Sequence, residues 1–212
     1  MTKTVLSILL VSVLPVMSES DEKGFKSIFN GKDFAAWSGP LDNYQIVEGV
    51  IQCKKGKGGT IFTKEVYADF VVRFEFKVPP GGNNGLALRY PGKGNTAYAG
   101  MCELQVLDEN YEKVRNAKLD PRQVHGSAYG MAGAKRGFQR PTGEWNEQEV
   151  TVKGATIKVI LNGTEILDAD LSKVKDFMGG KSHPGMNRKE GHFGFAGHSD
   201  PVSFRKIRIK RL

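Results

Sequence analysis

One short apolar stretch of the chain carries side chains suited to moving protons and binding polar ligands. It covers residues 103–108, ELQVLD, in which Glu103 and Gln105 are separated by a single leucine. In an extended strand, alternate residues share a face, so Glu103 and Gln105 would point together, away from the apolar residues between them. A carboxylate beside an amide can exchange a proton and hold a hydroxyl group. A solvent-facing glutamate on an ordinary strand is the competing interpretation.

The four histidines are the other groups suited to proton transfer near neutral pH. His192 and His198 bracket the run HFGFAGH, and alternation would bury its two phenylalanines and turn both histidines to the opposite face. His125 precedes a short segment predicted to be a strand, and His183 lies in a Gly/Pro-rich loop. His183 and His192 are most simply interpreted as surface residues. A metal site formed by histidines and Glu103 is left open, since no tight ligand spacing supports it.

Several common catalytic and binding motifs are missing from the sequence. It contains no Gly-x-Ser-x-Gly elbow, phosphate-binding loop, His-Glu-x-x-His helix or EF-hand loop. The two cysteines, Cys53 and Cys102, are too few for a disulfide scaffold or a four-cysteine zinc site. Whether these two pair with each other is left open, because sequence does not fix the distance between them.

The elements that must position these groups have a hydrophobic period of two almost throughout. Residues 70–78 alternate cleanly and end at the breaker PPGG. Residues 86–90 and 101–107 follow as further strands. Alternation places Arg89 opposite Leu86, Leu88 and Tyr90, so that it could share a surface with Glu103.

Two hairpins are predicted from their turn residues. Residues 44–47 and 50–53 flank Glu-Gly, and residues 156–161 and 164–167 flank Asn-Gly, the strongest short hairpin signal.

Further strands are expected at 26–29, 60–63, 127–130, 149–153, 192–196 and 202–212, and helical turns at 111–119 and 171–177. The apolar phase jumps between Phe204 and Ile207, which predicts a bulge at Arg205 and Lys206. Short strands with little helix predict an all-β fold, an antiparallel two-sheet sandwich.

Length and composition limit the number of domains and the fold classes that the chain can form. Its 212 residues suit one domain, and 26 glycines with 9 prolines disfavour a helical bundle. Residues 1–20 have a lysine at position 3, a short apolar run and small residues before an acidic stretch, as in a secretory signal peptide. We therefore expect a signal peptide at 1–20, a domain at 21–212, and export to the periplasm or the extracellular space.

The formal net charge is +8, and the basic residues are spread along the chain. The densest group, 205–211, alternates with isoleucines and is typical of the solvent face of a strand. No nucleic-acid partner is expected, and no integral membrane segment after removal of the signal peptide.

Motifs in a fixed order resemble the 3-keto-disaccharide hydrolase domain family over residues 25–212. The opening FKSIFNGKDFAAW is similar to the family's LFNGKDLSGW, and the ELQVLD run also looks like a degraded laminarinase-type Glu-x-Asp-x-x-Glu strand. Two departures are Asn84 in place of the usual serine and His198-Ser199 in place of His-Gly. The other matching segments are residues 83–89, 103–108, 126–129, 143–146, 161–163 and 202–209.

The resemblance implies a concanavalin A-like jelly roll that cleaves 3-keto-glycosides. A C3 ketone acidifies the C2–H bond, so that a base can form an enolate that expels the C1 substituent, and water can then add. The roles that the resemblance implies are catalytic for Glu103, His125 and His198 and substrate-binding for Arg89, Gln105, Tyr129 and Lys135, with a divalent metal left open. The alternative is a non-catalytic carbohydrate-binding jelly-roll module.

Overall fold

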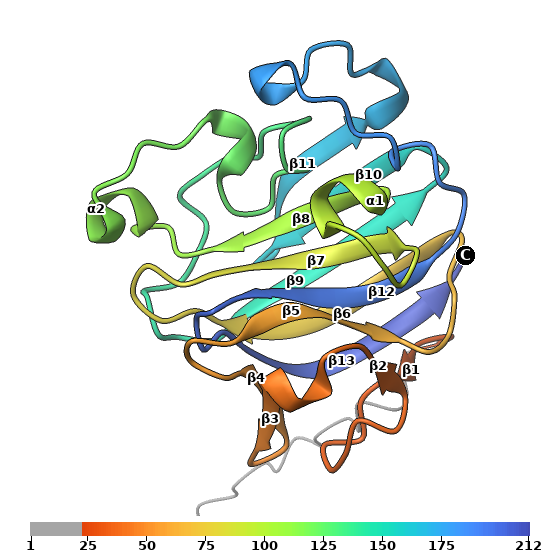
Figure 1. The fold of residues 1–212 in the computed structure, drawn as a ribbon, viewed down its shortest axis with the longest axis vertical. Helices are drawn as coiled ribbons and strands as arrows, with labels where there is room; N and C mark the ends of the chain where they lie inside the picture. The colour runs from red at the N-terminus through yellow and green to blue at the C-terminus, as the bar shows by residue number, and fades with distance from the viewer. Residues whose placement is uncertain (1–22) are drawn as a thin grey trace, which may run out of the picture.

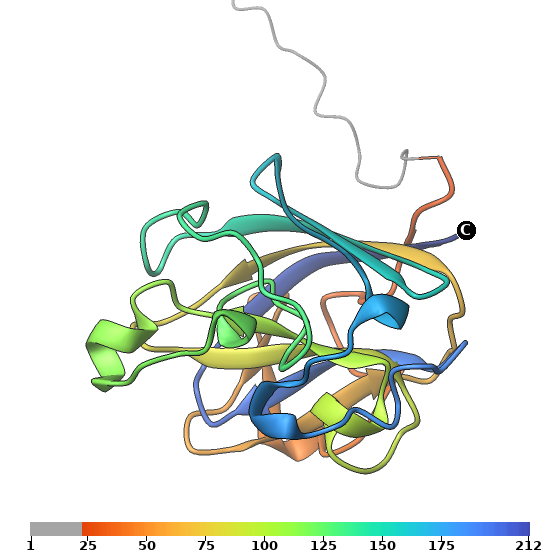
Figure 2. The same ribbon diagram turned by 90° about the horizontal axis from the view of Figure 1, so that it is seen from above.

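The computed structural model describes residues 23–212 and consists of two antiparallel β-sheets packed face to face (Figures 1 and 2). The prediction of an all-β, two-sheet sandwich is confirmed. The expected signal peptide at 1–20 lies outside the described residues, and export stays a prediction. Among the described helices, none has the length and apolar character needed to span a membrane.

The larger sheet has eight strands in the order β11-β10-β9-β6-β13-β4-β3, with β1 also paired to β13. Its strands are β1 (Lys26–Ser27), β3 (Tyr44–Val47), β4 (Val50–Cys53), β6 (Phe70–Lys77), β9 (Asn146–Lys153), β10 (Thr156–Leu161), β11 (Thr164–Asp170) and β13 (Ser203–Arg211). The smaller sheet has five strands in the order β2-β5-β12-β7-β8. Its strands are β2 (Trp37–Ser38), β5 (Gly58–Thr63), β7 (Asn83–Tyr90), β8 (Cys102–Leu107) and β12 (His192–His198).

Aromatic side chains fill the space between the sheets. Phe74 of β6, Phe195 of β12 and Phe204 of β13 are buried and contact one another, and the rings of Phe195 and Phe204 stack with centroids 3.9 Å apart. Trp37 packs on the other side of Phe195 at 5.4 Å. Burial of these rings stabilises the sandwich, since each fully buried large apolar side chain contributes about 1.5–3 kcal/mol.

The local predictions from turn and phase signals are confirmed. Both hairpin turns have positive φ at their two central residues, 51° and 77° at Glu48 and Gly49 and 48° and 83° at Asn162 and Gly163, as a type I′ turn requires. The register between β13 and β6 shifts after Arg205, which is the expected bulge. The predicted strand at 127–130 is wrong as a full strand, because its pairing is limited to isolated bridges at Ala128.

Two short helices, α1 (Thr96–Ala99) and α2 (Tyr111–Arg115), flank strand β8 in sequence. The sequence predicted α2 but not α1. In Figure 2, α1 and the loop that precedes β12 lie on the outer side of the smaller sheet. Short 3₁₀ turns complete the chain at Leu41–Asn43, Pro121–Gln123, Leu171–Lys173 and Met178–Gly180.

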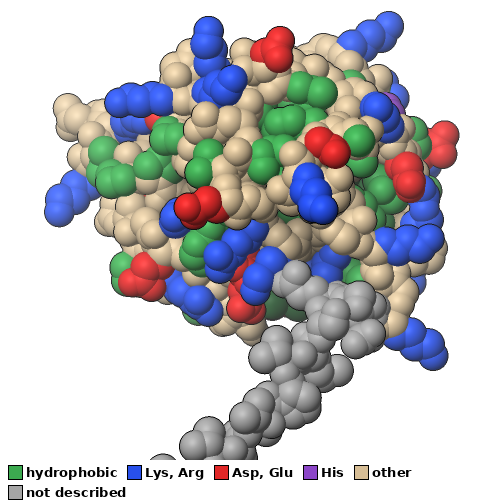
Figure 3. Space-filling model, turned by 90° about the horizontal axis from the view of Figure 1, so that it is seen from below, with side chains coloured by type: hydrophobic (Ala, Val, Ile, Leu, Met, Phe, Trp, Pro, Cys, Tyr) green, Lys and Arg blue, Asp and Glu red, His purple; other side chains and the backbone are tan. Residues whose placement is uncertain are grey.

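Basic side chains are interspersed with acidic ones on the face in Figure 3. In the larger sheet, basic side chains are paired across strands: Arg205 and Lys206, for example, both contact the carboxylate of Glu75, at 2.6 and 2.9 Å. The cysteines Cys53 and Cys102 are both buried free thiols, so the pairing that the sequence left open is not formed.

Candidate active site

A polar pocket of about 350 Å³ opens on the outer face of the smaller sheet. Its floor comes from β7, β8 and β12, and its walls come from α1, α2 and two loops. Four predicted site residues line it: Glu103, Gln105, Tyr129 and His198. The other lining residues are Asn83, Asn95, Ala97, Tyr98, Leu107, Tyr111, Leu119, Gln123 and Lys181.

The centre of the pocket is a hydrogen-bonded pair formed by Glu103 and His198. Nε2 of His198 lies 2.9 Å from Oε1 of Glu103. Glu103 is buried and His198 is exposed. The carboxylate is therefore largely enclosed by protein, whereas the imidazole ring is accessible from the pocket. The hydrogen bond to Glu103 raises the pKa of His198, opposing the partial loss of hydration of the ring at the pocket, which lowers it. The hydrogen bond to Glu103 therefore favours the protonated, imidazolium form of His198.

The pair spans strand β7, which lies between β8 and β12 in the sheet. The residue of β7 beneath the Glu103 side chain is Gly85, which pairs with Gln105 on one side and Ala196 on the other. A methyl group at position 85 would overlap the carboxyl group of Glu103. Gly85 is thus the small residue that lets Glu103 lie across the sheet toward His198.

The substitution Gly85→Ala should therefore disable the pair while the fold remains. Position 85 has a backbone conformation open to any residue, and the atoms that a Cβ meets belong to a flexible side chain. We expect roughly a 100-fold loss of any reaction that depends on Glu103, because a shift near 1 Å is costly in catalysis. Turnover and thermal unfolding of the variant check this. Activity close to wild type would contradict it, and in a Glu103→Ala background the substitution should cost nothing more.

Backbone pairing along the outer edge of β8 positions Tyr129. The Tyr129 N–H donates to the Glu103 carbonyl at 3.0 Å, and the Gln105 N–H donates to the Ser127 carbonyl at 3.0 Å. Tyr129 thus faces the pocket beside Glu103 although its segment is not a regular strand. Its ring lies edge-on to Tyr98 of α1, with centroids 6.5 Å apart.

Sequence reasoning missed Lys181 and Tyr98. The Lys181 ammonium lies 4.0 Å from the centroid of the Tyr98 ring, a cation–π contact at the pocket wall. The interpretation of His183 as a surface residue is wrong: its ring is buried and packs against Tyr98 at 4.7 Å, and its Nδ1 lies 2.8 Å from the Ala97 carbonyl. These contacts join the loop around residue 181 to α1. No signal in the sequence could place this loop at β8, since the residues are about eighty positions apart.

The structure corrects the expectation for Arg89, which does not reach the pocket. Arg89 has φ = 46° and lies where the register between β7 and β12 shifts, so the bulge breaks the alternation that would have turned it outward. Its guanidinium is buried, donates to Asp69 at 2.8 Å and also donates to the carbonyls of Ala68, Gly154 and Arg188. Arg89 joins three loops at one end of the sandwich.

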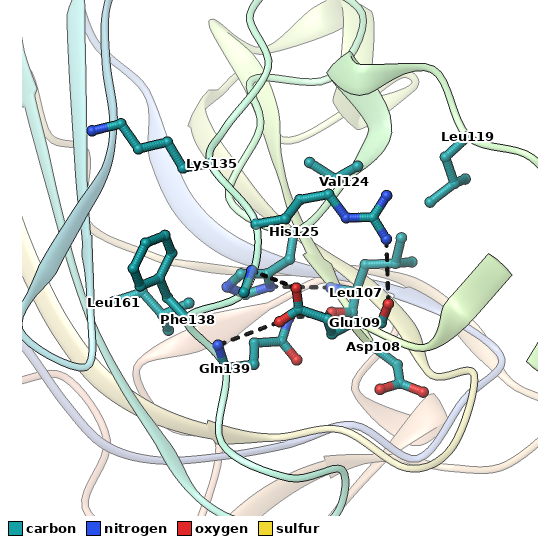
Figure 4. Close-up of a pocket in the computed structure, with 12 residues that line it drawn as sticks. Leu107, Asp108, Glu109, Leu119, Val124, His125, Lys135, Phe138, Gln139 and Leu161 are labelled. Carbon is teal, nitrogen blue, oxygen red and sulfur yellow. Dashed lines mark hydrogen bonds between the residues drawn. The ribbon is translucent and has the colours of Figure 1, made fainter. Parts of the chain in front are cut away.

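His125 and Lys135 are likewise outside the pocket, and the roles expected for them do not fit their positions. They line a separate cavity of about 20 Å³, in which Lys135 points away from His125 (Figure 4). His125 is buried, accepts from the Leu107 N–H and bonds to Gln148 at 2.9 Å. Lys135 donates to the Glu165 carbonyl on β11 at 3.4 Å.

The buried His125 should make the fold sensitive to acid. Burial lowers its pKa from 6.5 to about 4, so between these values the unfolded chain binds a proton that the native protein does not. Stability should fall by about 3 kcal/mol as the pH drops through that window. The non-titrating His125→Asn variant should show a shallower fall in urea unfolding across the same range. Equal slopes for the two proteins would contradict the assignment.

Among residues 23–212, no three side chains of the metal-binding types cluster together. In that part of the chain, Glu103 and His198 contact each other without a third such side chain to complete a group of three.

Comparisons with known proteins agree with the fold and with the family that the sequence resembles. Residues 24–210 match the family model described as the 3-keto-alpha-glucoside-1,2-lyase-like domain. A 3-keto-disaccharide hydrolase from Bacteroides thetaiotaomicron is 29% identical, over 91% of this chain and 80% of its own.

A crystal structure from Parabacteroides distasonis, provisionally named a glycosyl hydrolase, superposes with a TM-score of 0.76 and 28% identity, covering 89% of this chain and 99% of that one. A Bacillus subtilis protein with a galectin-like fold matches in fold alone, with a TM-score of 0.55 and 12% identity, over 88% of this chain and 94% of that one. Because its match covers nearly the whole described domain, the chain belongs to the 3-keto-alpha-glucoside-1,2-lyase-like domain family.

Proposed function

We propose that this protein is a carbohydrate-active enzyme that cleaves the glycosidic bond of 3-keto-glycosides. The observation that carries the proposal is the Glu103–His198 pair, with a carboxylate and an imidazole 2.9 Å apart inside a polar pocket. The family membership and the relative named 3-keto-disaccharide hydrolase support the same substrate class.

The pair suits an elimination next to a ketone. The Glu103 carboxylate takes the proton from C2, and the electron pair of the broken C–H bond forms an enolate with the C3 ketone. Collapse of the enolate expels the C1 substituent, which takes a proton from the His198 imidazolium and leaves as an alcohol. Water then adds to C1 of the resulting enone, while protonated Glu103 returns a proton to C2 and His198 recovers its own from the water. The sum is hydrolysis of the glycoside.

Lys181 supplies a further positive charge at the pocket wall. A cation held in place before the reaction stabilises negative charge that develops on an enolate oxygen. We assign Lys181 this electrostatic role, since Arg89 and Lys135, the two basic residues expected to bind the substrate, lie outside the pocket. Tyr129 and Tyr98 add phenolic hydroxyl groups on the same side of the pocket.

The direct test compares p-nitrophenyl 3-keto-α-glucoside with the unoxidised p-nitrophenyl α-glucoside. Only the keto compound has the acidic C2–H, so release of p-nitrophenol from it alone is the expected result. Parallel assays with a chelator report whether a metal is needed. Binding of the glucosides with cleavage of neither would favour the non-catalytic binding module.

The raised pKa of His198 predicts a pH profile. If its imidazolium protonates the leaving group, kcat should fall as pH rises through a value above the ordinary 6.5. The change Glu103→Gln removes the negative charge that raises this pKa, so the His198 ring should titrate at a lower pH. NMR titration of the ring protons measures the shift. An unchanged titration would show that Glu103 does not control His198.

A further inference from the structure

The hydroxyl group of Tyr44 crosses the core and lies between two strands of the smaller sheet. Tyr44 is on β3 of the larger sheet and is only 2% exposed. Its hydroxyl donates to the Gly59 carbonyl of β5 at 2.7 Å and accepts the Gly197 N–H of β12 at 2.9 Å, with the Phe195 carbonyl as a second acceptor at 3.1 Å. Gly59 and Gly197 face each other in the pairing of β5 with β12. One hydroxyl from the opposite sheet therefore bridges these two strands.

Glycines at this contact leave room for the phenol. A Cβ on Gly197 would lie 2.7 Å from the Tyr44 Oη and 2.7 Å from the Sγ of Cys53, closer than ordinary packing allows. Both of these side chains are buried, so neither can move aside easily. A Cβ on Gly58 would likewise overlap the Gly197 carbonyl. The close approach of Tyr44 to β12 therefore depends on the absence of a side chain at position 197.

The bridge lies one residue before His198, the last residue of β12. The pairing of β12 with β7 ends at Gly197, whereas His198 still pairs with Gly58 of β5. The main chain at His198 is therefore held from the β5 side, next to the point where the Tyr44 hydroxyl joins the two strands. The side chain of His198 contacts Glu103 at 2.9 Å across β7. A small movement at the end of β12 would break that hydrogen bond.

The residues after His198 are held by other groups. The Ser199 carbonyl accepts the Gly56 N–H at 2.9 Å, and the Asp200 carboxylate accepts the Asn83 N–H at 3.0 Å. His198 thus lies between two anchored points of the main chain. The larger sheet contributes to the first of these points through Tyr44.

We propose that Tyr44 is a positioning residue that holds His198 at hydrogen-bonding distance from Glu103. Tyr44 is buried in the core and does not line the pocket, so it does not touch the substrate. It acts through the main chain of Gly197, whose N–H it accepts. The inference rests on the proposed function for the part that His198 plays in the reaction, and on the hydrogen bonds of Tyr44 for the position of His198.

The test is Tyr44→Phe, which keeps the buried ring and removes one oxygen atom. NMR titration should show the His198 ring titrating at a lower pH than in the wild type, because a displaced ring loses the hydrogen bond that raises its pKa. With p-nitrophenyl 3-keto-α-glucoside, kcat should fall roughly 10- to 100-fold, since a displacement near 1 Å is costly in catalysis. KM should change less than kcat.

The matched control is Tyr90→Phe. The Tyr90 side chain is also buried, and its hydroxyl donates to the Gly94 carbonyl at 2.8 Å, but Tyr90 pairs with His192 at the other end of β12. Both variants lose a hydrogen bond and should have a lower Tm. The His198 titration and kcat should change in Tyr44→Phe and stay as in the wild type in Tyr90→Phe. Equal titrations in all three proteins, or an equal change in both variants, would overturn the inference.

Gly197→Ala reaches the same contact from β12 and replaces the test if Tyr44→Phe is too unstable to study. Its Cβ would displace the Tyr44 hydroxyl, so the same fall in the His198 titration is expected, and an unchanged titration would overturn the inference. Failure of the proposed function gives a different result. A lowered His198 titration in Tyr44→Phe, with a wild type that leaves the keto compound intact, would support the positioning role and overturn the proposed function. Wild-type turnover and titration in Tyr44→Phe would overturn this inference alone.

Discussion

Replacing Glu103 with glutamine should lower kcat for the 3-keto-glycoside by about 10²- to 10⁴-fold, the usual contribution of a positioned general base. The amide has nearly the size of the carboxylate and can still accept a hydrogen bond from His198, which lies 2.9 Å away. The variant therefore removes the base and the charge while the pocket keeps its shape. Initial rates of p-nitrophenol release, with substrate affinity measured separately, check the prediction.

The matched control for this variant is Glu75→Gln. Glu75 lies on β6 of the larger sheet and is paired with Arg205 and Lys206. Its replacement should leave turnover unchanged, although it also removes one negative charge. If Glu103→Gln kept a rate within a few-fold of wild type, the carboxylate would not be the base, and the proposed reaction would lose its main support.

Replacing Arg89 with methionine should destabilise the fold by about 3–5 kcal/mol, because it removes a buried guanidinium that donates to several acceptors and leaves those acceptors without their donor. The Arg89 guanidinium is buried, contacts Asp69 at 2.8 Å and donates to three backbone carbonyls. Those carbonyls and the carboxylate would lose their donor. For a chain of this length we expect the Tm to fall by roughly 6–20 °C, measured by thermal unfolding.

An exposed arginine provides the comparison. Arg136 pairs with Glu112 at 2.8 Å on the surface, and surface pairs contribute about 0–1 kcal/mol. Arg136→Met should therefore change the Tm little. The opposite pattern for Arg89→Met, a normal Tm with loss of glycoside binding, would restore the substrate-contact role that the sequence suggested.

Much of the smaller sheet could be predicted because its determinants are local. On β8, alternating apolar residues face the core, which puts Glu103 and Gln105 together on the outer face. The same period puts His198 on the outer face of β12. Face alternation therefore identified members of the pocket before any distance between strands was known.

Arg89 shows where alternation fails. A bulge costs little by itself and is formed here because contacts from Ala68, Asp69, Gly154 and Arg188 hold the side chain inward. Such contacts join segments that are far apart in the chain, so no local pattern encodes them. His125 is a similar case: its buried ring bonds to Gln148, which is 23 residues away in the chain.

The sequence by itself determined the all-β class, both hairpin turns, the bulge in β13 and the face on which Glu103, Gln105 and His198 lie, because periodicity and turn chemistry act over a few residues. The tertiary structure alone decided that β7 passes between Glu103 and His198 with a glycine beneath the carboxylate, and that Lys181 lines the same pocket. Those features depend on strand order and loop packing, which are set by the burial of the whole core and by no single segment.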